Sequence, residues 1–329
     1  MMKLSILDQS PISTNQTVHQ ALQASLTVAQ SAEKYGYTRY WIAEHHDLGG
    51  LACSAPEIML SYIGAQTKSI RIGSGAILLP HYKPYKVAEI SNMLATLFPG
   101  RIDIGIGRAP GGSAEVTNAL STNFLQQVYD MPKSLEALLH YVYNVFSEEN
   151  KPVAAPIPDI APHVWLLGTS KKSAQLAAKQ GLPYAFGQFM TDNDGRGIIN
   201  EYIQTFNIQK HNEKPYTILT ISAICAETTE KAFEQASSSL IWSIQKARGE
   251  GQEGVPSIEK ATKISLSLEE KDTVKKMQAN MVIGNRKEVA EKLRDIKKMY
   301  QADEIMIVTI THSLEDKLKS YELIANELL

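Results

Sequence analysis

The sequence predicts one domain over residues 1–329, a (β/α)8 barrel of the α/β class, also called a TIM barrel. Short apolar runs rich in β-branched residues alternate with longer helical patterns along the whole chain. Because a helix connects each strand to the next, the strands are expected to be parallel. Eight predicted strands favour a closed barrel over a doubly wound open sheet, which produces the same alternation. These strands lie near residues 3–8, 39–45, 71–79, 102–107, 164–168, 184–188, 217–225 and 304–310.

The predicted helices carry start and stop signals. Thr17 and Gln20 have the spacing of a capping box, and Gly36 stands where a glycine ends a helix, so the first helix is expected between them. Three more helices are predicted from a proline in the first turn, a glycine stop and a capping pair. They lie near 130–147, where Asp130 and Pro132 begin the helix, at 171–180, which ends at Gly181, and at 313–328, which begins at Ser313.

Two segments interrupt the alternation. Residues 147–162 hold four prolines, too many for a helix or a central strand. Residues 248–280 begin with a glycine-rich run and continue as a charged, weakly periodic segment, an insertion between the seventh and eighth strands. Such an insertion lies on the active-site face of a barrel, so we interpret 248–280 as a candidate lid. A surface insertion without function is the alternative.

The composition excludes several classes of protein. The chain is 43% hydrophobic and 21% charged, enough to bury a full core, and its net charge of −2 without a basic tract argues against nucleic-acid binding. Cys53 and Cys225 are far apart, so buried free thiols are expected rather than disulfides or a zinc site. With no signal peptide and no apolar run of membrane-spanning length, we expect a cytoplasmic protein.

The strand predicted near 102–107 ends in glycines followed by Arg108. Glycines let the backbone approach a ligand closely, and a guanidinium group suits a phosphate or a carboxylate. At the C-terminal tip of a barrel strand, Arg108 would lie on the active-site face. A dinucleotide fingerprint is not indicated, because Pro110 and the glycines after it oppose a helix start there.

A second anion-binding pattern follows the fifth predicted strand. Thr169, Ser170 and Ser173 stand at the start of a helix, where backbone N–H groups and hydroxyls can bind a phosphate. Any N-capping serine produces this pattern. The interpretation as a phosphate site is stronger because Arg108 lies on the same face, so that one dianion could bind both Arg108 and this helix start.

Glu44, His45, His46 and Asp47 end the second predicted strand. Adjacent side chains of a strand point to opposite sides, so at most one histidine faces the barrel mouth, and a metal site is not predicted. One histidine acting as a general base or stabilising a charge fits better, the alternative being a histidine bonded to a neighbouring loop.

Taken together, these motifs resemble the flavin-dependent luciferase-like monooxygenases, whose founding member is bacterial luciferase. The resemblance covers most of the chain. Its most specific parts are Trp41–His46, Gly73–Pro80, Gly100–Arg108 and Gly168–Pro183. By themselves, the small residues of Gly73–Pro80 are explained best by packing inside the barrel.

The resemblance implies a set of site residues. Arg108, Ser170 and Ser173 would bind the phosphate of FMN, with Thr169 supplying backbone. A cis peptide bond between Gly75 and Ala76 would support the flavin ring, His45 would assist the chemistry at the flavin, and 248–280 would be the family's mobile lid. One departure is Gly107, where bacterial luciferase has a reactive cysteine, so light emission is not assumed.

The implied function is a monooxygenase that uses dioxygen and reduced FMN, delivered by a separate flavin reductase, to oxidise a small organic substrate. Two alternatives stay open: a deazaflavin-dependent hydride-transfer enzyme of the same superfamily, and a non-catalytic protein that binds or carries FMN. Members of the family often dimerise through helices that here span residues 55–67 and 85–98, so a homodimer is expected. The substrate is not identified, because variable loops build its pocket.

Overall fold

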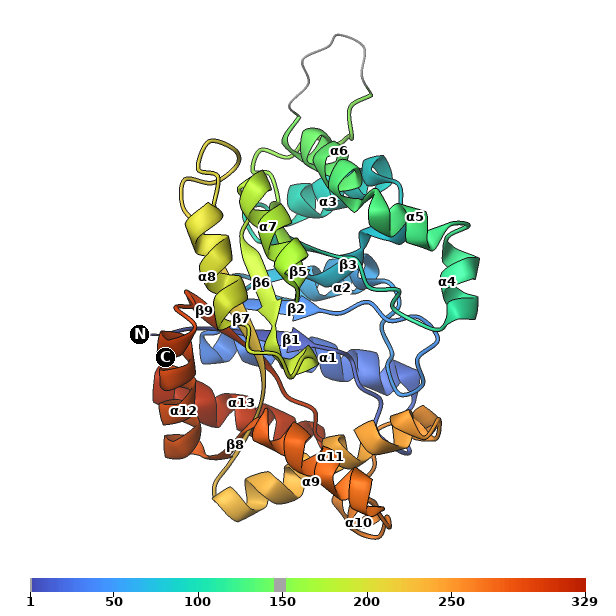
Figure 1. Ribbon diagram of the computed structural model, residues 1–329, viewed down its shortest axis with the longest axis vertical. Helices are drawn as coiled ribbons and strands as arrows, with labels where there is room; N and C mark the ends of the chain where they lie inside the picture. The colour runs from blue at the N-terminus through green and yellow to red at the C-terminus, as the bar shows by residue number, and fades with distance from the viewer. Residues whose placement is uncertain (1, 145–151) are drawn as a thin grey trace.

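The computed structural model describes residues 2–144 and 152–329, which form a closed barrel of eight parallel strands (Figure 1). Strands β1 to β7 are neighbours in chain order, and β9 closes the ring between β7 and β1. The predicted TIM barrel is therefore confirmed, and the open sheet was the wrong alternative. The barrel strands are β1 (Lys3–Asp8), β2 (Arg39–Ile42), β3 (Arg71–Leu78), β4 (Ile102–Gly107), β5 (His163–Gly168), β6 (Tyr184–Gly187), β7 (Thr217–Ala226) and β9 (Glu304–Val308).

Helices surround the barrel and cover its outer face. They are α1 (Val18–Tyr35), α2 (Pro56–Gln66), α3 (Pro84–Leu97), α4 (Ala114–Leu120), α5 (Phe124–Tyr129), α6 (Met131–Tyr143), α7 (Lys171–Gln180), α8 (Arg196–Thr205), α9 (Thr229–Ala247), α10 (Ile258–Thr262), α11 (Leu268–Ala279), α12 (Arg286–Met299) and α13 (Leu314–Leu328), with 3-10 turns η1 (Leu79–His81), η2 (Gln188–Met190) and η3 (Gly251–Glu253).

The predicted end signals operate as expected. The Thr17 hydroxyl accepts a hydrogen bond from the Gln20 N–H at 3.2 Å, the Gln20 side chain accepts one from the Thr17 N–H at 2.9 Å, and Gly36 ends α1 with φ 86°. Helices α7 and α13 match their predicted ranges. Helix α6 ends at Tyr143, and the last residues of the prediction 130–147 lie outside the described residues. Residues 152–162 contain no helix or strand.

Two predictions about strands were wrong. The second strand was expected to reach residue 45 but ends at Ile42, because the next backbone groups bond to loops: the His45 N–H donates to Cys53 O at 2.9 Å. A short ninth strand, β8 (Val282–Asn285), was missed, since four residues carry little periodicity. It pairs with the last residues of β7, outside the barrel ring.

The segment predicted as an insertion lies between α9 and β8 and consists of η3, α10 and α11, beside α9 at one end of the view in Figure 1. It is hydrogen-bonded to the loop after β1: the Val255 N–H donates to Ile12 O at 2.8 Å, and the Thr14 N–H donates to Val255 O at 2.9 Å. The segment therefore lies on the C-terminal face of the barrel, and its role as a lid stays a prediction.

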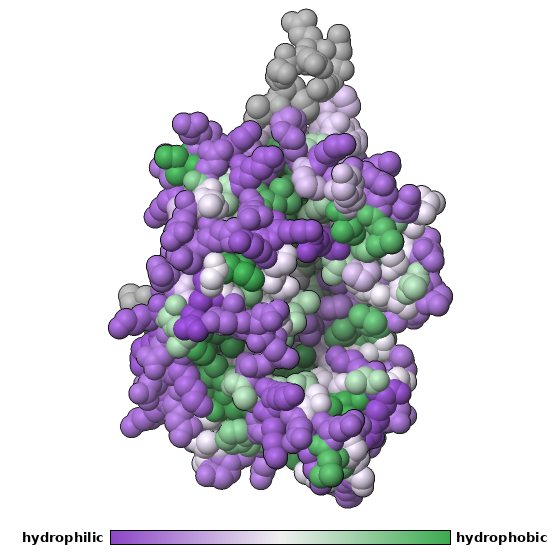
Figure 2. All heavy atoms as spheres, in the orientation of Figure 1, coloured by the Kyte–Doolittle hydropathy of each residue, from purple (hydrophilic) through white to green (hydrophobic). Residues whose placement is uncertain are grey.

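Alternation along β4 divides the core into two parts. Ile102, Ile104 and Ile106 belong to the apolar layer between the barrel and its helices, while the residues between them face the barrel interior. A smaller apolar cluster fills the interior, with Trp41 and Trp165 packed edge to face at 5.3 Å between ring centroids. In Figure 2, polar side chains cover most of the visible face, and apolar ones gather near its middle.

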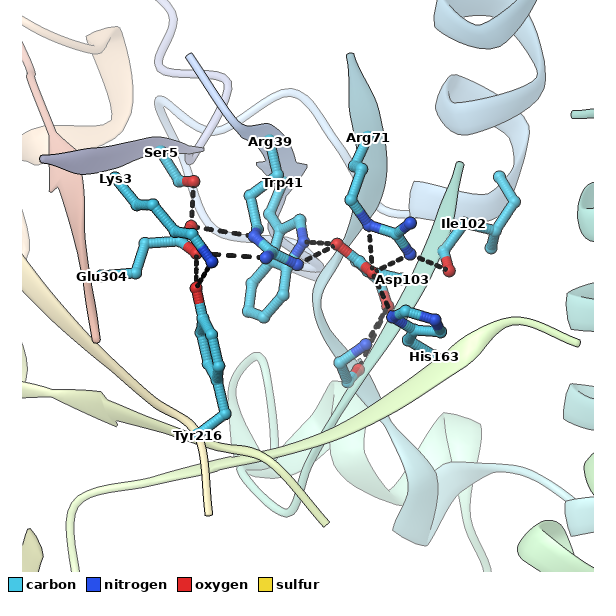
Figure 3. A network of polar contacts seen from close by, with 12 residues as sticks. Lys3, Ser5, Arg39, Trp41, Arg71, Ile102, Asp103, His163, Tyr216 and Glu304 are labelled. Carbon is cyan, nitrogen blue, oxygen red and sulfur yellow. Dashed lines mark hydrogen bonds and ion pairs between the residues drawn. The ribbon is translucent and has the colours of Figure 1, made fainter. Parts of the chain in front are cut away.

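Charged side chains, instead of apolar ones, fill the barrel at the N-terminal ends of the strands (Figure 3). The Arg39 guanidinium donates to Asp103 at 2.7 Å and to Glu304 at 2.8 Å. Arg71 donates to the other oxygen of Asp103 at 2.6 Å, and Trp41 Nε1 donates to Asp103 at 3.1 Å. This buried network joins four strands at the face of a barrel that stabilises the fold rather than carrying its chemistry.

Over residues 2–144 and 152–329, none of the helices is both long and apolar enough to cross a membrane.

Candidate active site

Arg108 and Ser170 meet at the C-terminal ends of β4 and β5. The Nη2 atom of Arg108 donates to Ser170 Oγ at 3.1 Å, and Ser170 caps the N-terminus of α7. The guanidinium is exposed, and in the described parts of the chain no carboxylate lies within ion-pair distance of it. The first turn of α7 offers N–H groups that have no acceptor within the helix. The fold thus brings together the two groups predicted to bind one dianion.

Ser173 and Thr169 hold different positions from Ser170. Ser173 is buried, and its hydroxyl donates to Ser170 O at 2.7 Å and lies 2.9 Å from the hydroxyl of Tyr184. It also completes the capping box of α7 with Ser170. Thr169 is half-buried in the turn between β5 and α7. Ser173 therefore stabilises the first turn of α7 from its buried side. The phosphate contacts of Ser173 and Thr169 stay predictions.

Ala76 lies at the mouth of the barrel, beside β4. The peptide bond between Gly75 and Ala76 is cis, as the resemblance implied, and the pairing of β3 with β4 shifts register between Ser74 and Ile77. A Cβ atom placed on Gly107 would lie 2.9 Å from the Cβ of Ala76. Gly107 therefore leaves the space that the Ala76 side chain occupies.

Glu44 joins the ends of β2 and β3. Its buried carboxylate accepts hydrogen bonds from the Leu78 N–H at 3.0 Å, the Tyr82 hydroxyl at 2.7 Å and His46 Nε2 at 2.7 Å. The backbone N–H of His46 in turn donates to Gly111 O at 2.8 Å. Glu44 therefore holds the strand end after Ala76 and, through His46, the loop that follows Arg108.

His45 has a different environment from His46. Its Nδ1 atom is buried without a hydrogen-bond partner among the described residues. Burial, the nearby ammonium of Lys246 and the neighbouring His46 lower the pKa of His45 to about 4. The imidazole is therefore neutral at neutral pH, and its Nδ1 atom is buried and unpaired, whereas Nε2 of His46 is bonded to Glu44.

A cavity of about 360 Å³ opens at the C-terminal ends of β1, β7 and β9. Its wall combines residues from η2, α9 and α11 with residues of the strand ends. The lining includes Phe189, Asp192, Ser239, Leu240, Trp242, Ser243, Lys246, Met277, Asn280, Met281, Val308 and Ile310. None of the predicted catalytic or cofactor-binding residues lines this cavity, although Met277 and Asn280 of the predicted lid do, so the cavity and the Arg108–Ser170 pair are separate features of one face.

Sequence reasoning missed Glu44 as a contact residue and missed the whole α9 wall. A carboxylate directly after Trp41-Ile42-Ala43 could have indicated a buried, bonded acid. Ser239, Ser243 and Lys246 recur at helical spacing, which could have indicated a polar strip on one helix face. Within the described residues no cluster of three or more His, Cys, Asp or Glu side chains could hold a metal ion.

Comparison with known proteins gives one family. The model described as luciferase-like monooxygenase matches residues 2–302. The N-acetyl-S-alkylcysteine monooxygenase of Bacillus subtilis (strain 168) is 35% identical over 335 residues, covering 100% of this chain and 99% of that protein. The luciferase-like monooxygenase of Escherichia coli (strain K12) is 33% identical over 321 residues, 97% of this chain and 95% of that one.

Solved structures share the fold. Apo-MsnO8 is 31% identical with a TM-score of 0.87 and covers 99% of this chain and 98% of its own. The oxygenating constituent of 3,6-diketocamphane monooxygenase from Pseudomonas putida, in complex with FMN, is 19% identical, with a TM-score of 0.72 and coverage of 100% and 98%. An F420-dependent secondary alcohol dehydrogenase is 14% identical, with a TM-score of 0.64 and coverage of 100% and 99%. At these last two identities the likeness concerns the fold alone.

Proposed function

The chain belongs to the luciferase-like monooxygenase family, and from that premise we propose that it uses dioxygen and reduced FMN to oxidise a small organic substrate. The observation that carries the choice of FMN is the contact between Arg108 and Ser170 at the start of α7. A flavin mononucleotide ends in a phosphate dianion, which a guanidinium, a hydroxyl and helix N–H groups bind together.

The residues present fit such a group. Arg108 carries no competing carboxylate in the described chain, and α7 directs its N-terminus to the same point. Gly107 adds no side chain beside Ala76. Arg108, Ser170 and Ser173 would hold the phosphate, with Thr169 supplying backbone, and the Gly75–Ala76 peptide would lie against the ring.

The protein's own groups position the bound flavin, exclude water from the site and transfer protons. Bound reduced flavin would supply the electrons that activate dioxygen. Glu44 keeps the end of β3 and the loop after Arg108 in place. His45, neutral at pH 7, can accept a proton or donate a hydrogen bond at Nδ1, according to its tautomer, and does not act as an imidazolium.

We expect the His45→Ala variant to bind reduced FMN as the wild type does but to lose coupled oxidation, by roughly 100-fold or more in product formed. Removing the imidazole takes away its buried, unpaired Nδ1 atom without touching the phosphate contacts. The measurement is product and hydrogen peroxide formed per dioxygen consumed, using the substrate that couples best in the wild type. His45→Asn, which keeps a hydrogen-bonding group, is the control. Unchanged coupling in His45→Ala would remove this role.

The proposed function is tested by anaerobic titration with photoreduced FMN, followed by rapid mixing with oxygenated buffer. We expect binding of reduced FMN and incorporation of one oxygen atom from 18O2 into a substrate. The substrates to be tested include thioethers, because one relative is named for an S-alkylcysteine substrate. Preference for reduced deazaflavin without oxygen consumption would replace the proposal by hydride transfer. Tight binding of oxidised FMN without any reaction would replace it by an FMN carrier. A separate flavin reductase is proposed as the donor of reduced FMN.

We further propose a homodimer through α2 and α3. On these helices Ile58, Met93 and Leu97 are 68%, 49% and 56% exposed. Exposed apolar side chains of this kind are expected where a second subunit covers the surface. Ile58→Asp combined with Met93→Asp is expected to convert dimers into monomers, as measured by sedimentation. Leu125→Asp, which changes an exposed leucine on α5, is the control. A wild-type monomer at micromolar concentration would contradict the proposal.

A further inference from the structure

Lys246 stands on the wall of the cavity described above, on the face of α9 that also carries Ser239 and Ser243. Its Nζ atom lies 3.7 Å from the centroid of the Trp242 ring, a cation–π contact. Trp242 is buried and anchored, since its Nε1 donates to Gly251 O at 3.0 Å. A Cβ on Gly251 would lie 2.5 Å from Lys246 Cγ, so the glycine makes room for the lysine stem. The lysine is thereby held along the wall.

The ammonium of Lys246 has no carboxylate within ion-pair distance in residues 2–144 and 152–329. The Lys246 side chain is exposed, and partial loss of hydration against the cavity wall lowers its pKa. Its charge also lowers the pKa of His45, so it lies near the residue proposed to handle protons. Asp192 is the other charged side chain on the described cavity wall. Its carboxylate is exposed and accepts from Asn280 Nδ2 at 2.6 Å, so it is already bonded.

The rest of the wall mixes polar and apolar side chains. Lys246 therefore supplies an unpaired positive charge at one side of a cavity that also offers apolar contacts. The apolar side chains of the wall include Phe189, Leu240, Met277, Met281, Val308 and Ile310.

We propose that this cavity binds the substrate and that Lys246 binds a carboxylate carried by a substrate that also has an apolar part. The inference rests on the proposed function, because it takes the ligand of the cavity to be the molecule that is oxidised. The carboxylate is distinct from the phosphate of FMN, which is assigned to Arg108 and Ser170 on the other side of the barrel mouth.

The test compares hexanoate with hexanamide, which has the same chain without the charge, by isothermal titration calorimetry with and without FMN. We expect the wild type to bind hexanoate at least roughly tenfold more tightly than hexanamide. Lys246→Met is expected to lose that preference while its affinity for hexanamide stays unchanged. Lys246→Arg should retain the preference, and Lys271→Met, an exposed lysine on α11, is the matched control.

Three results would overturn the proposal: a wild type that binds neither probe, one that binds both equally, or a Lys246→Met variant that keeps its preference for hexanoate. Failure of the proposed function is read separately, from binding of reduced FMN and its reaction with dioxygen. The comparison of acid with amide reports on Lys246 whichever way those measurements turn out.

Discussion

The Asp103→Ala variant is expected to unfold with a free energy about 3 to 5 kcal/mol lower than that of the wild type. Asp103 is fully buried and accepts from Arg39, Arg71 and the indole of Trp41. Removing it leaves two guanidinium groups inside the barrel with less compensating charge, and Glu304 can pair with only one of them. The loss therefore exceeds that of an ordinary polar contact.

Urea unfolding curves followed by circular dichroism measure this effect. Asp272→Ala on α11 is the matched control, because its exposed carboxylate forms only a surface ion pair, 3.8 Å from Lys275, and should change stability by less than about 1 kcal/mol. An Asp103→Ala protein as stable as this control would contradict the assignment of the network as a main stabiliser of the barrel.

The contribution of Asp103 also has a defined pH dependence. Burial by itself raises the pKa of this carboxyl, but Arg39 and Arg71 outweigh burial and hold the pKa below its ordinary value of 3.8. A depressed pKa in the folded state stabilises the fold above the pKa of the unfolded state, and the gain is lost as pH falls through the folded pKa. The stability difference between wild type and Asp103→Ala should therefore be constant at neutral pH and shrink below a pH of about 3.8.

Arg108→Ala is expected to bind reduced FMN roughly 10- to 150-fold more weakly, which corresponds to about 1.5 to 3 kcal/mol for a hydrogen bond to a charged group. The guanidinium is the charged member of the proposed phosphate site, and Ser170 with the α7 N-terminus would remain. Anaerobic fluorescence titration measures the affinity.

Riboflavin separates the phosphate from the ring in this experiment. Because riboflavin has no phosphate, Arg108→Ala should bind it as tightly as the wild type does. Arg196→Ala, an exposed arginine on α8 paired with Asp194, should change neither affinity. Equal losses for FMN and riboflavin would show that Arg108 supports the ring or the fold, and no loss for either would end the phosphate assignment.

Local patterns predicted much of the fold. Periodicity located all eight barrel strands, and capping residues such as Thr17 and Ser313 located helix ends, because these signals act between residues three or four apart. The end of β2 was misplaced because the residues after Ile42 bond to distant loops. Such competition is invisible within a window of a few residues.

The sequence by itself determined the alternation of strand and helix, and with it a barrel whose C-terminal face carries Arg108 and Ser170. Only the tertiary structure decided that Glu44 bonds to Tyr82, that Asp103 pairs with Arg39 and Arg71, and that the charge of Lys246 lowers the pKa of His45. The reason is geometric. A strand or helix depends on neighbours along the chain. A site depends on which strand ends and helix faces the closed barrel brings together from distant segments, such as those of His45 and Lys246.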